Sequence, residues 1–243
     1  MNTMANYKIR LTNREEIAEG TMAFHFEKPP EFQSKAGQAI DITLLNPPET
    51  DAEGNMRAFS VASPPFAEEL VIATRMRDTA FKRFLKAAPL GTEVSIEGPS
   101  GSFNLHKNTT KPGVFLAGGI GITPFMSIAR QAARDKLPHE LYLFYSNRRP
   151  EDAAFLPELK ALQQQNPKFH LIATMTEMTK SHREWKGETG YINREMLVKY
   201  VTNLEGPIYY VAGPPALVTA MREILTSAGV DEDDIRTEEF AGY

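Results

Sequence analysis

A glycine-rich turn in the middle of the chain, GVFLAGGIGITP at residues 113–124, constrains the fold more than any other segment. Residues 114–117 indicate a short buried strand, and three glycines follow it within four positions. Thr123 and Pro124 then indicate a helix start, because threonine is a good N-cap and proline is favoured at the first helical position. Such a junction presents unpaired backbone N–H groups at the positive end of a helix dipole, where a pyrophosphate can bind. About 110 residues of different character precede it, so the first half is expected to bind something else.

The same turn has a purely structural interpretation, in which small residues allow a tight connection between strand and helix. Gly118, Gly119 and Gly121 depart from the usual dinucleotide fingerprint, since no further glycine follows at the spacing which that motif needs. A second junction, YYVAGPP at residues 209–215, again has a strand, a glycine and helix-opening prolines. Because the carboxyl ends of parallel strands meet at one edge of a sheet, the two turns are predicted to hold opposite ends of one ligand.

The periodicity of apolar residues changes along the chain and predicts two domains. Short alternating or β-branched runs fill the first half and predict a small antiparallel β-barrel. Its strands are expected at 7–12, 21–27, 38–45, 56–62, 69–76 and 93–97, with a helix at about 79–87. The second half alternates apolar strands with amphipathic helices, which predicts a doubly wound α/β parallel sheet. Its strands are expected at 113–117, 140–145, 169–175 and 208–212, and its helices at 124–135 and 214–228. The polar segment 104–112 carries the boundary, so the predicted domains are residues 1–108 and 109–243.

Composition excludes several kinds of chemistry. The 243-residue chain has no cysteine, which excludes disulfides, thiolate-bound iron–sulfur clusters and cysteine nucleophiles. Its five histidines show no ligand spacing, so no metal site is expected, and no nucleophile elbow indicates a hydrolase. A net charge of −4 argues against a nucleic-acid partner. Since neither a secretory signal nor an apolar run of membrane-spanning length is visible, the chain is expected to be cytoplasmic, without membrane insertion.

A third motif, Arg57-Ala58-Phe59-Ser60, lies in the predicted barrel. The fork of an arginine suits a phosphate, and on a strand Phe59 points the same way as Arg57 and can offer a ring face. Taken alone, these residues are better explained as a solvated arginine beside a core phenylalanine.

Four ordered motifs nevertheless resemble, over nearly the whole chain, the ferredoxin–NADP reductase-like flavoproteins. They are RAFS at 57–60, GPSGSF at 98–103, GGIGITP at 118–124 and AGPP at 212–215. The resemblance implies an FAD-binding antiparallel barrel followed by a nicotinamide-nucleotide α/β domain, in agreement with the division predicted from periodicity. It also implies the cofactors, FAD and either NADPH or NADH.

The resemblance gives individual residues expected roles. Arg57 would bind the FAD pyrophosphate, Phe59 would replace the family's usual tyrosine against the isoalloxazine ring, and Ser60 would lie by its reactive nitrogen. Thr123 would lie near the nicotinamide, a role compatible with that of a helix cap. Arg75 and Arg77 are alternatively plain surface charge. The other cofactor-binding residues expected in the matching segments are Ala58, Ala73, Thr74, Arg75, Met76, Thr79, Ala80, Phe81, Gly118, Gly119, Gly121, Pro124, Ser146, Arg148, Ala212, Gly213, Pro214 and Tyr243.

The C-terminal segment 236–243 resembles the family's last strand, which runs into the flavin site. Glu239 would lie near Ser60 in a proton path, and Tyr243 would cover the flavin face that the nicotinamide reaches; a frayed tail is the alternative. The expected catalytic residues are Ser60, Thr123 and Glu239. Ala212 stands where the family often has a cysteine, which removes a thiol contact to the nicotinamide but leaves hydride transfer to the cofactors.

The choice of nucleotide depends on the residues that follow the second parallel strand. Ser146, Arg148 and Arg149 can hold a 2′-phosphate, and no acidic residue directly ends the strand to bind a ribose diol, which favours NADPH over NADH. Glu151 and Asp152 follow closely, however, and alternatively cap the next helix while the arginines stay solvated.

Together these features predict an FAD-dependent enzyme that passes hydride from NAD(P)H to FAD and then electrons to a separate acceptor. Without cysteine there is no built-in iron–sulfur domain, so a ferredoxin, a flavodoxin, an oxygenase component or a ferric chelate is the expected acceptor. One alternative is an NADH-using reductase component of an oxygenase or a ferric-chelate reductase. An alternative of another class is a non-catalytic subunit that binds flavin or nucleotide.

Overall fold

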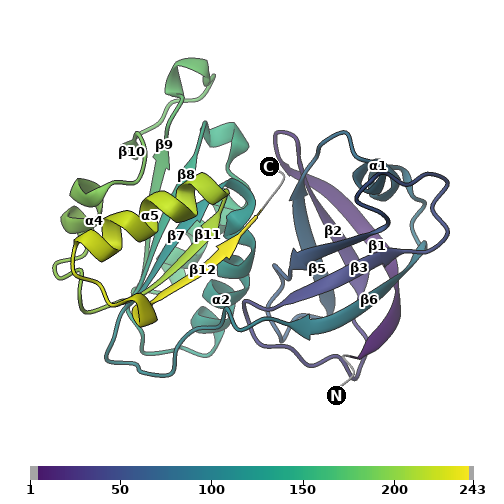
Figure 1. Cartoon of the computed structure of the whole chain (residues 1–243), viewed down its shortest axis with the longest axis horizontal. Coiled ribbons are helices and arrows are strands. Elements are labelled where there is room, and N and C mark those ends of the chain that lie inside the picture. Colours follow the sequence, from purple (N-terminus) through teal and green to yellow (C-terminus); the bar gives the residue numbers. More distant parts are fainter. Residues whose placement is uncertain (1–4, 241–243) are drawn as a thin grey trace.

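The computed structural model describes residues 5–240, which form two sheets side by side (Figure 1). The first sheet has six antiparallel strands in the order β4-β3-β6-β1-β2-β5. Its elements are β1 (Asn6–Ala18), β2 (Thr21–Glu27), β3 (Ala39–Leu44), β4 (Met56–Ser60), β5 (Glu69–Arg75), α1 (Ala80–Ala87) and β6 (Glu93–Ser100). Just beyond β4, the Ala62 N–H donates to the Val71 carbonyl of β5 (2.8 Å), which brings the two edges together into a barrel.

Alternation of side chains explains the barrel core. In β3, Ile40, Ile42 and Leu44 are buried, while the residues between them are partly exposed. Strand β2 has the predicted bounds, whereas β1 is longer than expected because its second half pairs with β2 through two register shifts. The barrel prediction is therefore confirmed.

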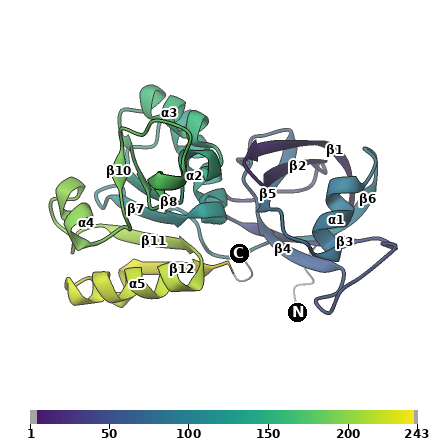
Figure 2. The same cartoon turned by 90° about the horizontal axis from the view of Figure 1, so that it is seen from above.

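The second sheet has six parallel strands in the order β10-β9-β8-β7-β11-β12. The strands are β7 (Gly113–Gly118), β8 (Leu141–Asn147), β9 (Phe169–Met175), β10 (Glu188–Thr189), β11 (Ile208–Gly213) and β12 (Ile235–Glu239). The helices are α2 (Thr123–Arg134), α3 (Leu156–Gln165), α4 (Arg194–Tyr200) and α5 (Pro215–Ser227). Figure 2 shows α2 and α3 on one face of the sheet and α5 on the other. Along β7 the side chains alternate between the two cores, Phe115 with one and Val114 with the other, so the doubly wound prediction is confirmed.

Helix α2 connects the two parts of the molecule. The Ser127 hydroxyl donates to the Ser63 carbonyl (2.9 Å), and Arg130 donates to the Ala62 carbonyl (3.0 Å). Ala62 and Ala73 of the barrel also belong to the apolar cluster that α2 helps to form. The interface is therefore partly a continuation of the α/β core. Across residues 5–240, no helix is long and apolar enough to cross a membrane.

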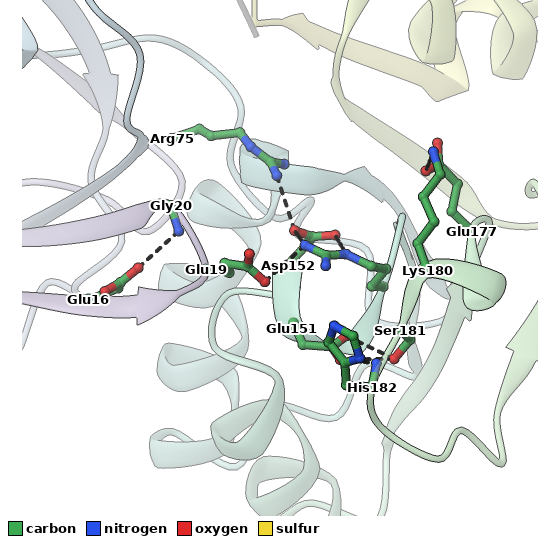
Figure 3. A network of polar contacts seen from close by, with 11 residues as sticks. Glu16, Glu19, Gly20, Arg75, Glu151, Asp152, Glu177, Lys180, Ser181 and His182 are labelled. Atoms are coloured by element: carbon green, nitrogen blue, oxygen red, sulfur yellow. Dashed lines mark hydrogen bonds and ion pairs between the residues drawn. The ribbon is translucent and has the colours of Figure 1, made fainter.

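An ion-pair cluster adds a polar contact between the same two parts (Figure 3). Arg75 at the end of β5 donates to Asp152 across the interface (3.2 Å). Arg149 donates to Asp152 (2.9 Å) and also to Glu19 at the end of β1 (3.0 Å). Burial works to raise the pKa of Asp152, but the hydrogen bonds and charge of Arg149, with the charge of Arg75, hold it below its usual range. The Asp152 side chain is 2% exposed, so it is an ionised group almost sealed between two arginines.

Candidate functional site

A cavity of about 530 Å³ lies at the carboxyl edge of the parallel sheet, where this type of fold binds ligands. Both parts of the molecule line it. The α/β part contributes Gly118, Gly119, Ile120, Ser146, Asn147, Arg148, Thr176, Glu177, Tyr191, Ile192, Pro214, Ala216, Leu217, Ala220 and Met221. The barrel contributes Arg75, Met76 and Arg77, and Phe240 follows β12. The cavity is therefore shared between the two parts of the molecule rather than enclosed within one of them.

The two glycine turns are packed against each other. A Cβ on Gly121 would lie 2.2 Å from the Ala212 carbonyl oxygen, and one on Gly213 would lie 3.1 Å from the Gly118 nitrogen. A Cβ on Gly119, by contrast, would meet nothing within 4 Å, and this residue adopts a φ of +53°. Gly121 therefore has the packing role that the structural interpretation gives it, and Gly119 leaves its backbone open to the cavity.

Thr123 differs from the expectation. A short 3₁₀ turn, Gly119–Ile122, precedes α2, so Thr123 does not cap the helix. The Thr123 side chain is buried. Its hydroxyl donates to the carbonyl of Ile120 (3.1 Å), a residue of the 3₁₀ turn directly before α2. Pro124 and Ala212 are likewise buried and, like Thr123, absent from the cavity lining, whereas Pro214 is part of that lining.

The end of β8 separates the two arginines that were expected to act together. Ser146 and Arg148 line the cavity, but Arg149 is turned into the ion-pair cluster with Asp152 and Glu19. These ion pairs turn Arg149 away from the cavity, and its expected role at a 2′-phosphate stays a prediction. The partner of Arg149 is buried Asp152 in the short 3₁₀ turn that follows, Pro150–Asp152. The sequence suggested only a helix cap for Asp152.

Glu177 and Tyr191 are cavity residues that the sequence did not single out. A hydrogen bond from Lys180 (2.7 Å), helped by the charge of Arg148, keeps the pKa of Glu177 below its usual range. Tyr191 is 76% exposed, an unusual state for so large a ring. The sequence signal for Tyr191 was weak, since it consisted of an aromatic residue next to a glycine in a long loop.

Phe59 lies in the barrel core instead of facing a ligand. In the ladder it stands opposite buried Ile40, its ring centre is 5.8 Å from that of Phe81, and it is 5% exposed. Side chains on a strand alternate, so Ala58 and Ser60 face the other side of β4. The expected stacking of Phe59 on a flavin is not supported, and the alternative of a core phenylalanine is the one that the structure shows.

Arg57 and the start of α1 were expected to bind phosphate, and they already share one anion. Asp51 accepts from the Arg57 guanidinium (3.0 Å) and from the Ala80 N–H at the first turn of α1 (3.0 Å). Thr79 caps the helix, accepting from the Lys82 N–H (3.3 Å), and Phe81 is buried. Since a carboxylate sits between them, these groups have the chemistry and the spacing to bind a negatively charged oxygen.

The end of β5 and strand β12 carry the other residues that were expected at the site. Arg75 and Met76 line the cavity, while Ala73 and Thr74 are buried. Glu238, not Glu239, interacts with Ser60, and Glu239 is exposed, because the alternation along β12 turns only one of the two inward. Burial raises the pKa of Glu238 and the Ser60 hydroxyl only partly offsets this; its Oε2 has no hydrogen-bond partner among residues 5–240. Tyr243 lies outside the described residues.

Comparisons with known proteins agree with this geometry. Residues 115–223 match the model of the oxidoreductase NAD-binding domain. The chain is 28% identical over 223 residues to a glycine betaine monooxygenase reductase subunit of Chromohalobacter salexigens, covering 90% of this chain and 60% of the relative. It is 30% identical over 186 residues to one component of a Na⁺-translocating NADH-quinone reductase of Methylococcus capsulatus, covering 75% of this chain and 44% of the relative. The chain thus spans less than two thirds of the length of these relatives.

Solved structures share the whole two-part fold. A cytochrome P450 reductase of Amycolatopsis superposes with a TM-score of 0.82 at 21% identity, covering 98% of this chain and 71% of that one. A ferredoxin–NADP⁺ reductase of Neisseria gonorrhoeae with bound FAD and NADP gives 0.79 at 20% identity, covering 96% and 98%. At this level of identity the similarity shows the fold alone, and it extends over both parts of the chain.

Proposed function

Because this chain belongs to the ferredoxin–NADP reductase-like family, we propose that it is a flavin-dependent reductase that takes hydride from a nicotinamide nucleotide and gives electrons to a separate acceptor. The shared cavity carries this proposal. Gly119 and Pro214 border it on the α/β side, and Arg75 to Arg77 border it on the barrel side. A dinucleotide held along it would extend from the sheet edge to the barrel, which in the proposal carries the flavin.

The residues of this chain have separate tasks in that reaction. FAD supplies the chemistry of accepting hydride and releasing electrons singly. The open backbone at Gly119 and the start of the helical segment hold a pyrophosphate, and Tyr191 offers its exposed ring to the adenine. Glu238, whose pKa is raised by burial, retains a proton more readily than a solvated glutamate and shares it with the Ser60 hydroxyl.

The cavity favours NADH as the nucleotide, contrary to the expectation from sequence. Arg149 is held elsewhere, so Arg148 is the remaining arginine of the pair, and the ionised Glu177 stands beside it. A carboxylate binds a ribose diol and repels a 2′-phosphate. We expect Glu177→Gln to improve kcat/KM for NADPH about tenfold or more relative to NADH, and Arg148→Ala to lower it for NADPH alone. A wild-type protein that prefers NADPH would contradict this assignment.

The electron acceptor is proposed from the relatives. Since similar proteins are named as components of a monooxygenase and of a quinone reductase, a separate protein such as an oxygenase component, a ferredoxin or a flavodoxin is the proposed acceptor. A panel of these proteins and a ferric chelate, each assayed for reduction with NADH, would distinguish them.

The visible spectrum tests the reaction itself. Protein incubated with FAD and then freed of unbound flavin is expected to stay yellow and to bleach when NADH is added without oxygen. Binding of flavin and nucleotide without bleaching would support the non-catalytic subunit instead. A protein that binds neither is not a flavin reductase.

A further inference from the structure

We propose that Asp51 is a built-in competitor for the phosphate groups of FAD: its carboxylate fills the anion position between Arg57 and α1, and it has to leave for FAD to bind. The inference rests on the proposed function, since it concerns the affinity of the same flavin site. It makes Asp51 the residue that sets how tightly the chain holds FAD.

Asp51 bridges two groups that suit a phosphate. One Asp51 oxygen accepts from Arg57 (3.0 Å) and the other from the Ala80 N–H (3.0 Å), so a single carboxylate bridges a guanidinium and a helix N-terminus. Bridging of these two donors is what a phosphate does at such a site. The loop that carries Asp51 connects β3 to β4, beside α1 (Figure 2).

Several positive charges gather at this position. Lys82 lies close enough to Arg77 and Arg57 for both charges to act on it. Burial, followed by these two charges, lowers the pKa of Lys82 to about 8. Glu53 gives Arg57 a second carboxylate (2.9 Å), but its side chain is 70% exposed. Arg57, Lys82 and the N-terminus of α1 thus lie together, an environment suited to the charges of a pyrophosphate, while the neighbouring Glu49 and Asp78 pair with Arg83.

Asp51 can leave its position without damage to the core. No residue from 45 to 55 is fully buried, and within this loop Asp51 is held by a bridge to Gly54 and by the Glu53 N–H, which donates to its carboxylate (3.1 Å). Arg57 is positioned independently of Asp51, because its Nη1 donates to the Glu53 carbonyl (2.8 Å) and the Met56 carbonyl (2.7 Å). Asp51 and the exposed Glu53 both occupy the Nη2 edge, which is therefore the part of the guanidinium that an incoming phosphate can take over.

Flavin titration of the flavin-free protein tests the proposal. In Asp51→Asn the competing charge is lost, and the Kd for FAD is expected to fall about tenfold or more, while the Kd for riboflavin, which has no phosphate, stays unchanged. Glu49→Gln is the matched control: it removes one charge from the same loop, but Glu49 pairs with Arg83 (2.8 Å) instead of Arg57. Its FAD affinity is expected to stay within about twofold of wild type.

The kinetics of association give a second measurement. If loop opening precedes binding, the observed rate of FAD association saturates with FAD concentration in the wild type and does not saturate in Asp51→Asn. An unchanged or weakened FAD affinity in correctly folded Asp51→Asn, together with normal riboflavin binding, overturns the competitor and leaves the proposed function intact. Failure of wild type and both variants to bind any flavin overturns the two proposals together.

Discussion

Glu238 carries an energetic cost in the folded protein. Burial on folding raises the pKa of this carboxyl, so the native state binds the proton of Glu238 more tightly than the unfolded chain does. Stability is therefore lost as the pH rises above the ordinary glutamate pKa of about 4.3. Since Oε2 lacks a hydrogen-bond partner within residues 5–240, the contact of Glu238 with Ser60 recovers only part of the loss.

We therefore expect Glu238→Gln to raise the Tm at pH 7.5, by about 2–4 °C for each kcal/mol recovered. The gain should shrink as the pH is lowered toward 4.3, because the native carboxyl is then protonated and, like the amide, uncharged. Flavin reduction should slow in the same variant, since an amide cannot exchange the proton with Ser60. Scanning calorimetry across pH checks the first part, and a Tm gain that persists at low pH would contradict it. Glu239→Gln, at an exposed position on the same strand, is the control.

At the scale of elements, the two turns that follow β7 and β11 form one unit. Gly121 lies beneath the Ala212 carbonyl, so even a methyl group needs a backbone shift. We expect Gly121→Ala to destabilise the protein by about 1–3 kcal/mol and to weaken nucleotide binding, because the turn around Gly119 moves with it. Gly206→Ala is the control, since the nearest atom to its added Cβ is 3.6 Å away. Chemical denaturation measures both; equal stability of the two variants would show that the turns are not interlocked.

Sequence patterns identified most elements, and the same reasoning explains where they failed. Strand β2 and helix α2 follow from alternation and from 3.6-residue periodicity, which are local properties. Arg57 and Phe59 do share a face of β4, as a period of two requires, but pairing with Ile40 turns that face inward. The sequence also did not reveal the contact of Arg149 with Glu19 or that of Glu238 with Ser60, because both contacts are fixed by tertiary packing.

At the scale of the whole molecule, the ion-pair cluster at Asp152 connects the barrel to the α/β part. Asp152→Asn leaves Arg75 and Arg149 without their shared charge, and we expect a loss of about 1–3 kcal/mol. A pKa held low on folding stabilises the native state above the unfolded pKa of about 3.9, so the wild type should lose this contribution as the pH falls through the native pKa. Glu19→Gln removes only an exposed partner and should cost less than about 0.5 kcal/mol. Thermal unfolding from pH 3 to 7 tests both; a variant as stable as wild type at pH 7 would exclude the cluster as a connection between the parts.

The interlocked glycine turns have a further consequence for how the two proposed ligands bind. The turns are fixed by packing of backbone against backbone, so the conformational entropy of the nucleotide cradle is lost when the chain folds, and little remains to be lost on binding. At the proposed flavin position the carboxylate of Asp51 is held by a loop without fully buried residues, and in our proposal FAD binding there includes a rearrangement of this loop. Preorganisation is thus unequally distributed: the cradle for the nucleotide is rigid, and the position for the flavin phosphates is adaptable.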